Sequence, residues 1–196
     1  LFMLVVLTII LPPQTILPSM TLNFNYFDFG GILSLIPGKP TINLLDTPFT
    51  FVLPSLFASG LRGGLFIFIF RQFFWGIPKA LEEAARIDGC SAFNTFIRII
   101  VPIAVPVFIT VTLFSFVWHW NDLYSATMYF TDVRLLTPNL NNLDRLLATS
   151  TVDVKGYAAR TYMAAAPLLV ILPPLILYIF TQRYFTESIE RTGIVG

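Results

Sequence analysis

Arg62, His119 and Asp122 are polar side chains embedded in long apolar stretches of the sequence. Ionisable groups at membrane depth are costly, and they mark transport paths, proton relays or reactive sites. In an intramembrane enzyme these three residues would be the candidate catalytic groups, but no nucleophile–base pair is recognisable by spacing. His119 is the only histidine. We therefore expect no metal site and interpret His119 as a packing or interfacial residue.

Motifs for nucleotide binding or hydrolysis are missing from the chain. Gly38-Lys39 is followed by Pro40, and Leu33 stands where a phosphate-binding loop requires its first glycine. Neither a Gly-x-Ser-x-Gly nor a His-Glu-x-x-His pattern occurs. We expect no catalytic residue and no cofactor, so any nucleotide binding must come from another chain.

Aromatic and polar side chains gather in one short run from Trp118 to Asp122. Indole faces with carboxamide and carboxylate groups suit the rings and hydroxyl groups of a sugar. In a helix that starts at Pro102, this run lies roughly 24–30 Å along the axis, towards the far side of a membrane. Trp118, Trp120, Asn121 and Asp122 are therefore candidates for a substrate path. Trp is also typical of the membrane interface, and an Asp at a helix end can simply cap it.

Arg62 has two interpretations. It lies about nine residues, or ~13 Å of helix, before Arg71. A charge at that depth usually faces a polar cavity or a partner, which would make Arg62 part of the translocation path. If the helix begins later, near Leu61, Arg62 instead lies at the outer interface.

The elements that must position these residues are apolar. Of 196 residues, 56% are hydrophobic and only 12% are charged, with a mean hydropathy of +0.76. Soluble domains carry about twice that charge, so we expect an all-α, polytopic transmembrane helical bundle in contact with membrane lipid. The net charge of +1 gives no basic face for nucleic acid. Cys90 is the only cysteine, which excludes an intrachain disulfide.

Four runs reach the roughly 20 residues that cross a ~30 Å hydrocarbon core. They cover residues 1–20, 49–74, 102–130 and 162–184, and prolines interrupt the first and the fourth. Leu1 already lies inside an apolar run without the charged n-region of a signal peptide. We therefore expect an N-terminally truncated bundle that lacks upstream helices. Connections 23–47 and 131–160 are expected to be loops, the second with a short helix over 140–148.

A polar island, residues 75–101, separates the second and third runs. Pro78 suits a first helical position, and residues 79–87 are strong helix formers. Asp88-Gly89 predicts a stop, because glycine adopts the left-handed cap conformation at little cost. Ser91 can cap a second helix, over 92–100, that ends before Pro102.

The first helix of the island presents a shallow face. Leu81, Ala84, Ala85 and Asp88 share that face by helical spacing, so a partner could approach the backbone closely. The competing interpretation is a surface loop that lies on the membrane and is held there by apolar residues of the second helix.

The island resembles the EAA loop of bacterial ABC importer permeases. Glu82 to Gly89, followed by Ile99 and Pro102, is similar to the carbohydrate branch, which includes the maltose and glycerol-phosphate permeases. Three further stretches match in order and at family spacing, so the resemblance covers about residues 51–185. They are Arg71-Gln72-Phe73-Phe74, Trp118-x-Trp120-Asn121-Asp122 and Gln182-Arg183-Tyr184-Phe185. Val101 departs from the usual Leu.

This resemblance implies a type-1 permease domain over residues 1–185 and a cytoplasmic tail over 186–196 that differs from the commonest one. The island would be a cytoplasmic coupling helix that fits a cleft on an ATP-hydrolysing subunit. Glu83 and Gly89 fall on the signature positions of the family, and Ala84 and Ala85 on its close-contact positions. The implied coupling residues are Glu82, Glu83, Ala84, Ala85, Asp88, Gly89, Ile99 and Pro102.

The implied partners are two ATPase subunits, a second similar permease and an extracellular solute-binding protein, in a bacterial inner membrane. The chain would import a sugar or related polyol by alternating access. With the island and C-terminus inside, six of the 12 Lys and Arg residues lie inside and five outside, so the positive-inside rule hardly decides orientation. Two alternatives remain: an ABC permease for a non-sugar solute, and an intramembrane enzyme.

Overall fold

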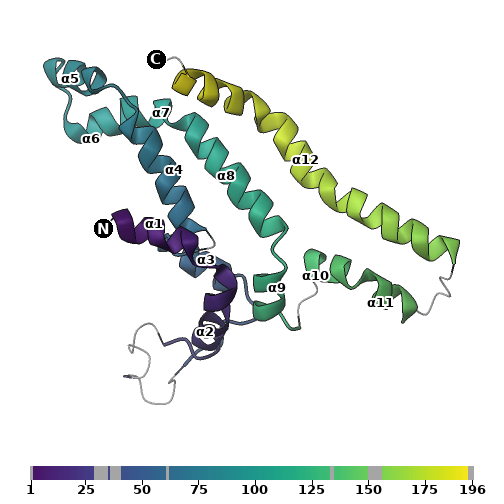
Figure 1. Cartoon of the computed structure of the whole chain (residues 1–196). Coiled ribbons are helices and arrows are strands. Elements are labelled where there is room, and N and C mark those ends of the chain that lie inside the picture. The colour runs from purple at the N-terminus through teal and green to yellow at the C-terminus, as the bar shows by residue number, and fades with distance from the viewer. Residues whose placement is uncertain are drawn as a thin grey trace.

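The computed structural model describes residues 2–28, 35, 41–60, 62–132, 135–149 and 156–193, with side chains up to residue 184. Within these ranges the chain is helical, with one isolated antiparallel bridge between Phe27 and Ile42 and no strand. The expected all-α class is confirmed. Figure 1 shows α4, α8 and α12 running side by side, with a two-helix projection at one end.

The first apolar run, residues 1–20, forms two helices and no straight span. α1 covers Phe2–Ile10 and α2 covers Pro13–Asn25, and the chain bends by 101° between them. Pro12 has an extended backbone, with φ −66° and ψ 128°. The following proline disfavours a helical conformation there, so the Pro12-Pro13 pair ends α1 and sets the bend.

The second run, residues 49–74, is also broken. α3 covers Phe49–Leu56 and α4 covers Gly63–Trp75. Between them, Ala58 and Arg62 have left-handed backbones with φ of 54° and 58°. α1 packs against α4, and it does so at Gly64, where a β-carbon would collide with the Thr8 hydroxyl.

The polar island forms a hairpin of short helices between α4 and α8. α5 covers Lys79–Ile87 and α6 Ala92–Thr95, and a π-helical turn over Phe96–Ile100 leads into α7, Val101–Ile103. α8 then covers Val105–Trp120. The chain bends by 62° between α4 and α5 and by 63° between α7 and α8. Figure 1 shows the hairpin projecting beyond the ends of α4 and α8.

The sequence predicted that the second helix of the island ends before Pro102. In the structure it continues through Pro102 to Ile103. The helix widens into the π-helical turn, where Val101 N–H donates to the Phe96 carbonyl five residues back. Such local π adjustments let a helix continue through a proline. The bend instead falls at Ala104, which is fully buried.

Past α8, the chain forms three short helices and one long one. α9 covers Tyr124–Tyr129, α10 Leu136–Asn141 and α11 Leu143–Ala148, so the connection contains two short helices instead of the expected one. α12 covers Tyr157–Gly193 and packs along α8.

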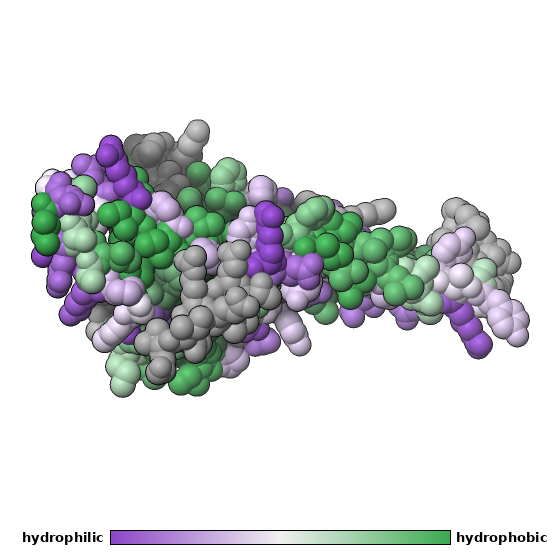
Figure 2. Space-filling view, turned by 90° about the horizontal axis from the view of Figure 1, so that it is seen from above, coloured by the Kyte–Doolittle hydropathy of each residue, from purple (hydrophilic) through white to green (hydrophobic). Residues whose placement is uncertain are grey.

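One helix of the described chain, over 157–184, is long and apolar enough to cross a membrane, and up to four spans result if each bent pair counts as one. Figure 2 shows hydrophobic residues gathered over the middle of α12, with hydrophilic residues on either side of them. The helix extends to Gly193, so most of the expected tail, 186–196, continues α12. Residues 194–196 lie outside the described part, as do most residues of the loop centre, 29–40.

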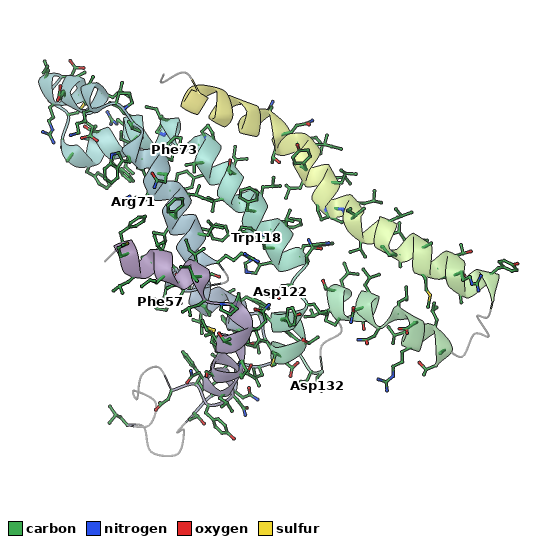
Figure 3. All side chains as sticks on the ribbon, viewed as in Figure 1. Phe57, Arg71, Phe73, Trp118, Asp122 and Asp132 are labelled. Atoms are coloured by element: carbon green, nitrogen blue, oxygen red, sulfur yellow. The ribbon has the colours of Figure 1, made fainter. Side chains whose placement is uncertain are left out.

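At the end opposite the hairpin, α2, α3 and α9 form a small core. Phe24 and Phe51 each make edge-to-face contacts with Tyr129, at ring separations of 5.3 and 5.6 Å. The Asp46 carboxylate ties the start of this segment to the chain after α9. It accepts the Thr131 N–H at 2.7 Å, the Thr131 hydroxyl at 3.0 Å and the Asp132 N–H at 3.0 Å (Asp132 is labelled in Figure 3).

Candidate functional site

The turn of the α5–α6 hairpin has the predicted chemistry. Gly89 has a φ of +78°, and its N–H donates to the Arg86 carbonyl at 3.0 Å. The Ser91 hydroxyl accepts the Asn94 N–H at 3.4 Å and so caps α6. The bounds of α5, Lys79–Ile87, are those expected from the sequence. This hairpin is therefore encoded locally.

The residues that the sequence assigned to one face of α5 differ in how far they are buried. Ala84 and Asp88 are exposed, whereas Ala85 is only 3% exposed. The Ala85 carbonyl accepts the Cys90 N–H at 2.9 Å, so Ala85 lies in the angle of the hairpin. Ala84, and not Ala85, is available to an approaching partner. Glu82, Glu83 and Gly89 are exposed as well.

Large apolar side chains are exposed on the hairpin beside these charges. Ile87 is 87% exposed and Phe93 73%. Figure 2 shows hydrophilic and hydrophobic residues intermixed at the end of the molecule where α5 lies. Apolar side chains grouped in a polar surface mark contact sites for proteins or membranes. Sequence reasoning missed Ile87, although an isoleucine ending a polar helix was a usable signal.

Ile99 and Pro102 belong to the joint and not to the hairpin surface. Ile99 is half-buried in the π-helical turn, and Pro102 is exposed in α7. The predicted coupling residues therefore form two groups, one on α5 and its turn and one where the hairpin joins α8.

Arg62 and Trp118 come together at the other end of α4. Arg62 precedes the first residue of α4, as in the interpretation that the helix begins near Leu61. Its guanidinium carbon lies 4.5 Å from the centroid of the Trp118 ring. Phe114 stacks on Trp118 at 5.5 Å, and Phe66 lies 5.6 Å from it. Figure 3 shows Trp118 near the end of α8, with Asp122 just beyond it.

Trp120 joins α8 to α12. Its indole N–H donates to the Val170 carbonyl at 3.0 Å. Within a helix this carbonyl would pair with residue 173 or 174, but Pro173 and Pro174 have no N–H. The indole therefore satisfies a carbonyl that two prolines leave open, which gives Trp120 a structural role that sequence reasoning missed.

The other polar residues between Trp118 and Asp122 differ in exposure and in hydrogen bonding. The Asn121 amide donates to the Val117 carbonyl at 2.8 Å and stays exposed. Asp122 accepts the Ser125 N–H at 3.2 Å through Oδ1, while Oδ2 is buried and has no hydrogen-bond partner among the described residues. His119 Nδ1 lies 2.7 Å from the Ser115 carbonyl, in agreement with a packing role.

Two hollows lie near these residues. The first, a cavity of about 450 Å³, lies inside the α1–α2 bend and reaches α3, α4 and α9; Arg62 lines it. The second is an open groove of about 600 Å³ between α3 and α8, and Trp120 lines it. Trp118, Asn121 and Asp122 line neither. The predicted substrate-path residues are thus not gathered into one site. No group of His, Cys, Asp and Glu side chains in the described ranges could hold a metal ion.

The fold defines a class of protein: a multi-helix membrane component with an exposed helical hairpin at one end. The chain belongs to the family of binding-protein-dependent transport system inner membrane components, which it matches over residues 1–191. The resemblance read from the sequence is thereby confirmed. Members are transport subunits, which removes the enzyme alternative.

Three relatives illustrate the branch. Protein LplC of Bacillus subtilis is 30% identical over 180 residues, which is 88% of this chain and 59% of LplC. The arabinooligosaccharides transport system permease AraQ of Halalkalibacterium halodurans is 31% identical over 165 residues, 79% of this chain and 51% of AraQ. The alpha-glucoside transport system permease AglG of Rhizobium meliloti is 30% identical over 135 residues, 67% of this chain and 33% of AglG. The chain thus spans between 33% and 59% of the length of these relatives, and no solved structure matches it.

Proposed function

We propose that this chain is a membrane-spanning permease subunit of an ATP-binding-cassette importer for a sugar or related polyol. The observation that carries the proposal is the exposed α5–α6 hairpin, set off from α4 and α8 by bends of 62° and 63°. Relatives named for arabinooligosaccharide and alpha-glucoside transport support the sugar class.

The hairpin is the contact with an ATP-hydrolysing subunit on the cytoplasmic side. Ala84 offers close backbone approach, Ile87 and Phe93 offer apolar anchors, and Glu82 and Glu83 offer charge at the rim. Closure of two ATPase subunits favours one orientation of the hairpin. Because a partner shifts an equilibrium only by binding one state better than the other, this preference switches the bundle between inward and outward access.

A second, similar permease and an extracellular solute-binding protein complete the importer. The apolar window of α12 is 0% buried within this chain, which leaves that helix for lipid and for the second permease. Hydrophobic surface of this extent is typical of helices that face a bilayer or another span.

Cysteine cross-linking tests the docking role with a matched pair of variants. In the importer co-expressed with its neighbouring ATPase, Ala84→Cys should cross-link to that ATPase, because residue 84 is exposed. Ala85→Cys, one residue on but 3% exposed, should not. Equal capture of both variants, or capture of neither, would refute this placement. Uptake of a saccharide panel into proteoliposomes then tests the sugar class, and uptake of non-sugar solutes alone would exclude it.

A further inference from the structure

Arg71 lies between two aromatic rings near the hairpin end of α4. Its guanidinium carbon is 3.9 Å from the ring centroid of Phe2, on α1, and 4.3 Å from the ring centroid of Trp75, about one helical turn further along α4. Phe2 also stacks on Phe68 of α4, at a ring separation of 6.1 Å. Figure 3 shows Arg71 on α4, beside α1. Two helices that are separate in the sequence therefore hold this guanidinium in place.

The N–H groups of the Arg71 guanidinium are free to bind an anion. Among the described residues, none accepts a hydrogen bond from Arg71 or forms an ion pair with it. These nitrogens are also accessible, because the only side-chain nitrogen or oxygen in the described ranges that is buried without a hydrogen-bond partner is Asp122 Oδ2. Contacts with aromatic rings use the flat faces of a guanidinium, and its N–H edge matches phosphate or carboxylate oxygens in a two-bonded geometry. Arg71 is thus a preformed binding group for an anion from outside the described chain.

The depth of Arg71 in the membrane indicates which anion can reach it. Trp75 is the last residue of α4 and is 70% exposed, and tryptophan is typical of the membrane interface. Arg71 lies four residues earlier, about 6 Å of helix towards the bilayer centre. On α1, Met3 and Leu4 are 77% and 62% exposed, so this chain leaves the corner beside Phe2 uncovered. Close to the interface of a membrane, the phosphates of anionic lipids attract basic side chains.

We propose that Arg71, held between Phe2 and Trp75, binds the phosphate of an anionic phospholipid in the leaflet on the side of the hairpin. The N–H edge of the guanidinium donates to two phosphate oxygens, and the acyl chains lie along the exposed apolar residues of α1. A zwitterionic lipid binds less tightly, because its choline group brings a second cation close to Arg71. The inference depends on the membrane location of the chain and not on the solute that it carries.

Native mass spectrometry of the purified importer, with its ATPase subunits and partner permease, tests this proposal. The probes are phosphatidylglycerol, phosphatidylcholine and the soluble headgroup glycerol 1-phosphate, each added to the delipidated complex in detergent. Phosphatidylglycerol should bind about fivefold more tightly than phosphatidylcholine, which is the effect of one charge near a membrane surface. Glycerol 1-phosphate should not displace it. Displacement at equal concentration would overturn the assignment to a lipid.

Variants of Arg71 separate a built site from general attraction between charges. Arg71→Gln should weaken the binding of phosphatidylglycerol about ten- to a hundredfold, the range expected for a lost hydrogen bond to a charged group. Arg71→Lys should lose less, because it keeps the charge without the two-bonded edge. Arg98→Gln is the matched control, since Arg98 is an exposed arginine in the π-helical turn at the same end of the molecule. It should weaken binding about fivefold at most.

Two results would refute the lipid site. Equal losses in Arg71→Gln and Arg98→Gln would show that lipid responds only to the overall charge at this end of the molecule. Equal binding of phosphatidylglycerol to wild type and Arg71→Gln would show that Arg71 does not hold the lipid. If Arg71→Gln fails to assemble with the ATPase, Trp75→Leu provides the same comparison. It leaves every charge in place and removes one of the two rings, so phosphatidylglycerol should bind less tightly, and unchanged binding would contradict the proposal.

Discussion

Replacing Gly89 by alanine isolates the effect of backbone conformation on the α5–α6 hairpin. Gly89 has a φ of +78°, and a β-carbon there meets nothing within 4 Å. The substitution therefore creates no collision, and its whole cost is the left-handed conformation, about 1–2 kcal/mol for a residue with a side chain. A change of this size shifts a local equilibrium by a factor of about 5–30.

Gly76 supplies the matched control. It lies between α4 and α5 with a right-handed φ of −75°, and a β-carbon there meets only carbonyl oxygens at ordinary separations of 3.4 and 3.7 Å. Gly76→Ala adds the same methyl group without the conformational cost. Gly89→Asn should fall between the two, since asparagine tolerates the left-handed region better than alanine.

The assay is hydrogen exchange of the α5 and α6 amides, combined with solute uptake per ATP hydrolysed. Gly89→Ala should raise exchange about 5–30-fold across the hairpin and lower uptake per ATP, with membrane insertion unchanged. Gly76→Ala should match wild type in both measurements. If Gly89→Ala and Gly76→Ala behave alike, the turn does not depend on the left-handed conformation and the reasoning is refuted.

Three further predictions, with four variants, follow from burial, hydrogen bonding and close helix packing. Ala85→Leu should open the hairpin at a cost of about 1–3 kcal/mol, which would appear as faster hydrogen exchange in α5. Ala84→Leu should keep normal exchange in α5 and weaken co-purification with the ATPase. Faster exchange in Ala84→Leu than in Ala85→Leu would contradict the difference in burial between the two alanines. Asp46→Asn keeps a residue that tolerates the φ of 59° but loses the charge that three donors share, so thermal stability should fall by about 1–3 kcal/mol. Unchanged melting would show that the Asp46 contacts are dispensable. Gly64→Leu should separate α1 from α4, and a disulfide engineered across that contact should no longer form.

Local signals made the hairpin predictable from the sequence. Gly89 ends α5 and Ser91 caps α6, and each acts within a few residues of itself. Pro78 is not the first helical residue that the sequence predicted, because it directly precedes α5 with an extended backbone, φ −61° and ψ 128°. The all-α class followed from composition. The same reasoning gave α5 its bounds but not its orientation, because which alanine is buried depends on how the turn folds α6 back.

Non-local packing limited the other predictions. Nothing within a few residues of Pro102 indicates that a π-helical turn lets the helix continue. Arg62 lies in an apolar run that reads as continuous helix, yet a left-handed loop interrupts it. From the sequence alone, Trp120 was a candidate for a sugar contact. Its hydrogen-bond partner, the carbonyl of Val170, lies 50 residues further along the chain, so the local sequence could not reveal the structural role of Trp120. Its partner became visible only when α12 was placed against α8.

The bond between Trp120 and Val170 has a consequence for how the protein is assembled in the membrane. While α12 is alone in lipid, the carbonyl of Val170 has neither a helical donor nor water, and an exposed carbonyl in hydrocarbon costs several kcal/mol. Only one depth and one rotation of α12 bring it to the indole of α8. A uniformly hydrophobic helix could pack against α8 in many ways. The two prolines therefore give α12 one preferred position along α8 while the protein is assembled.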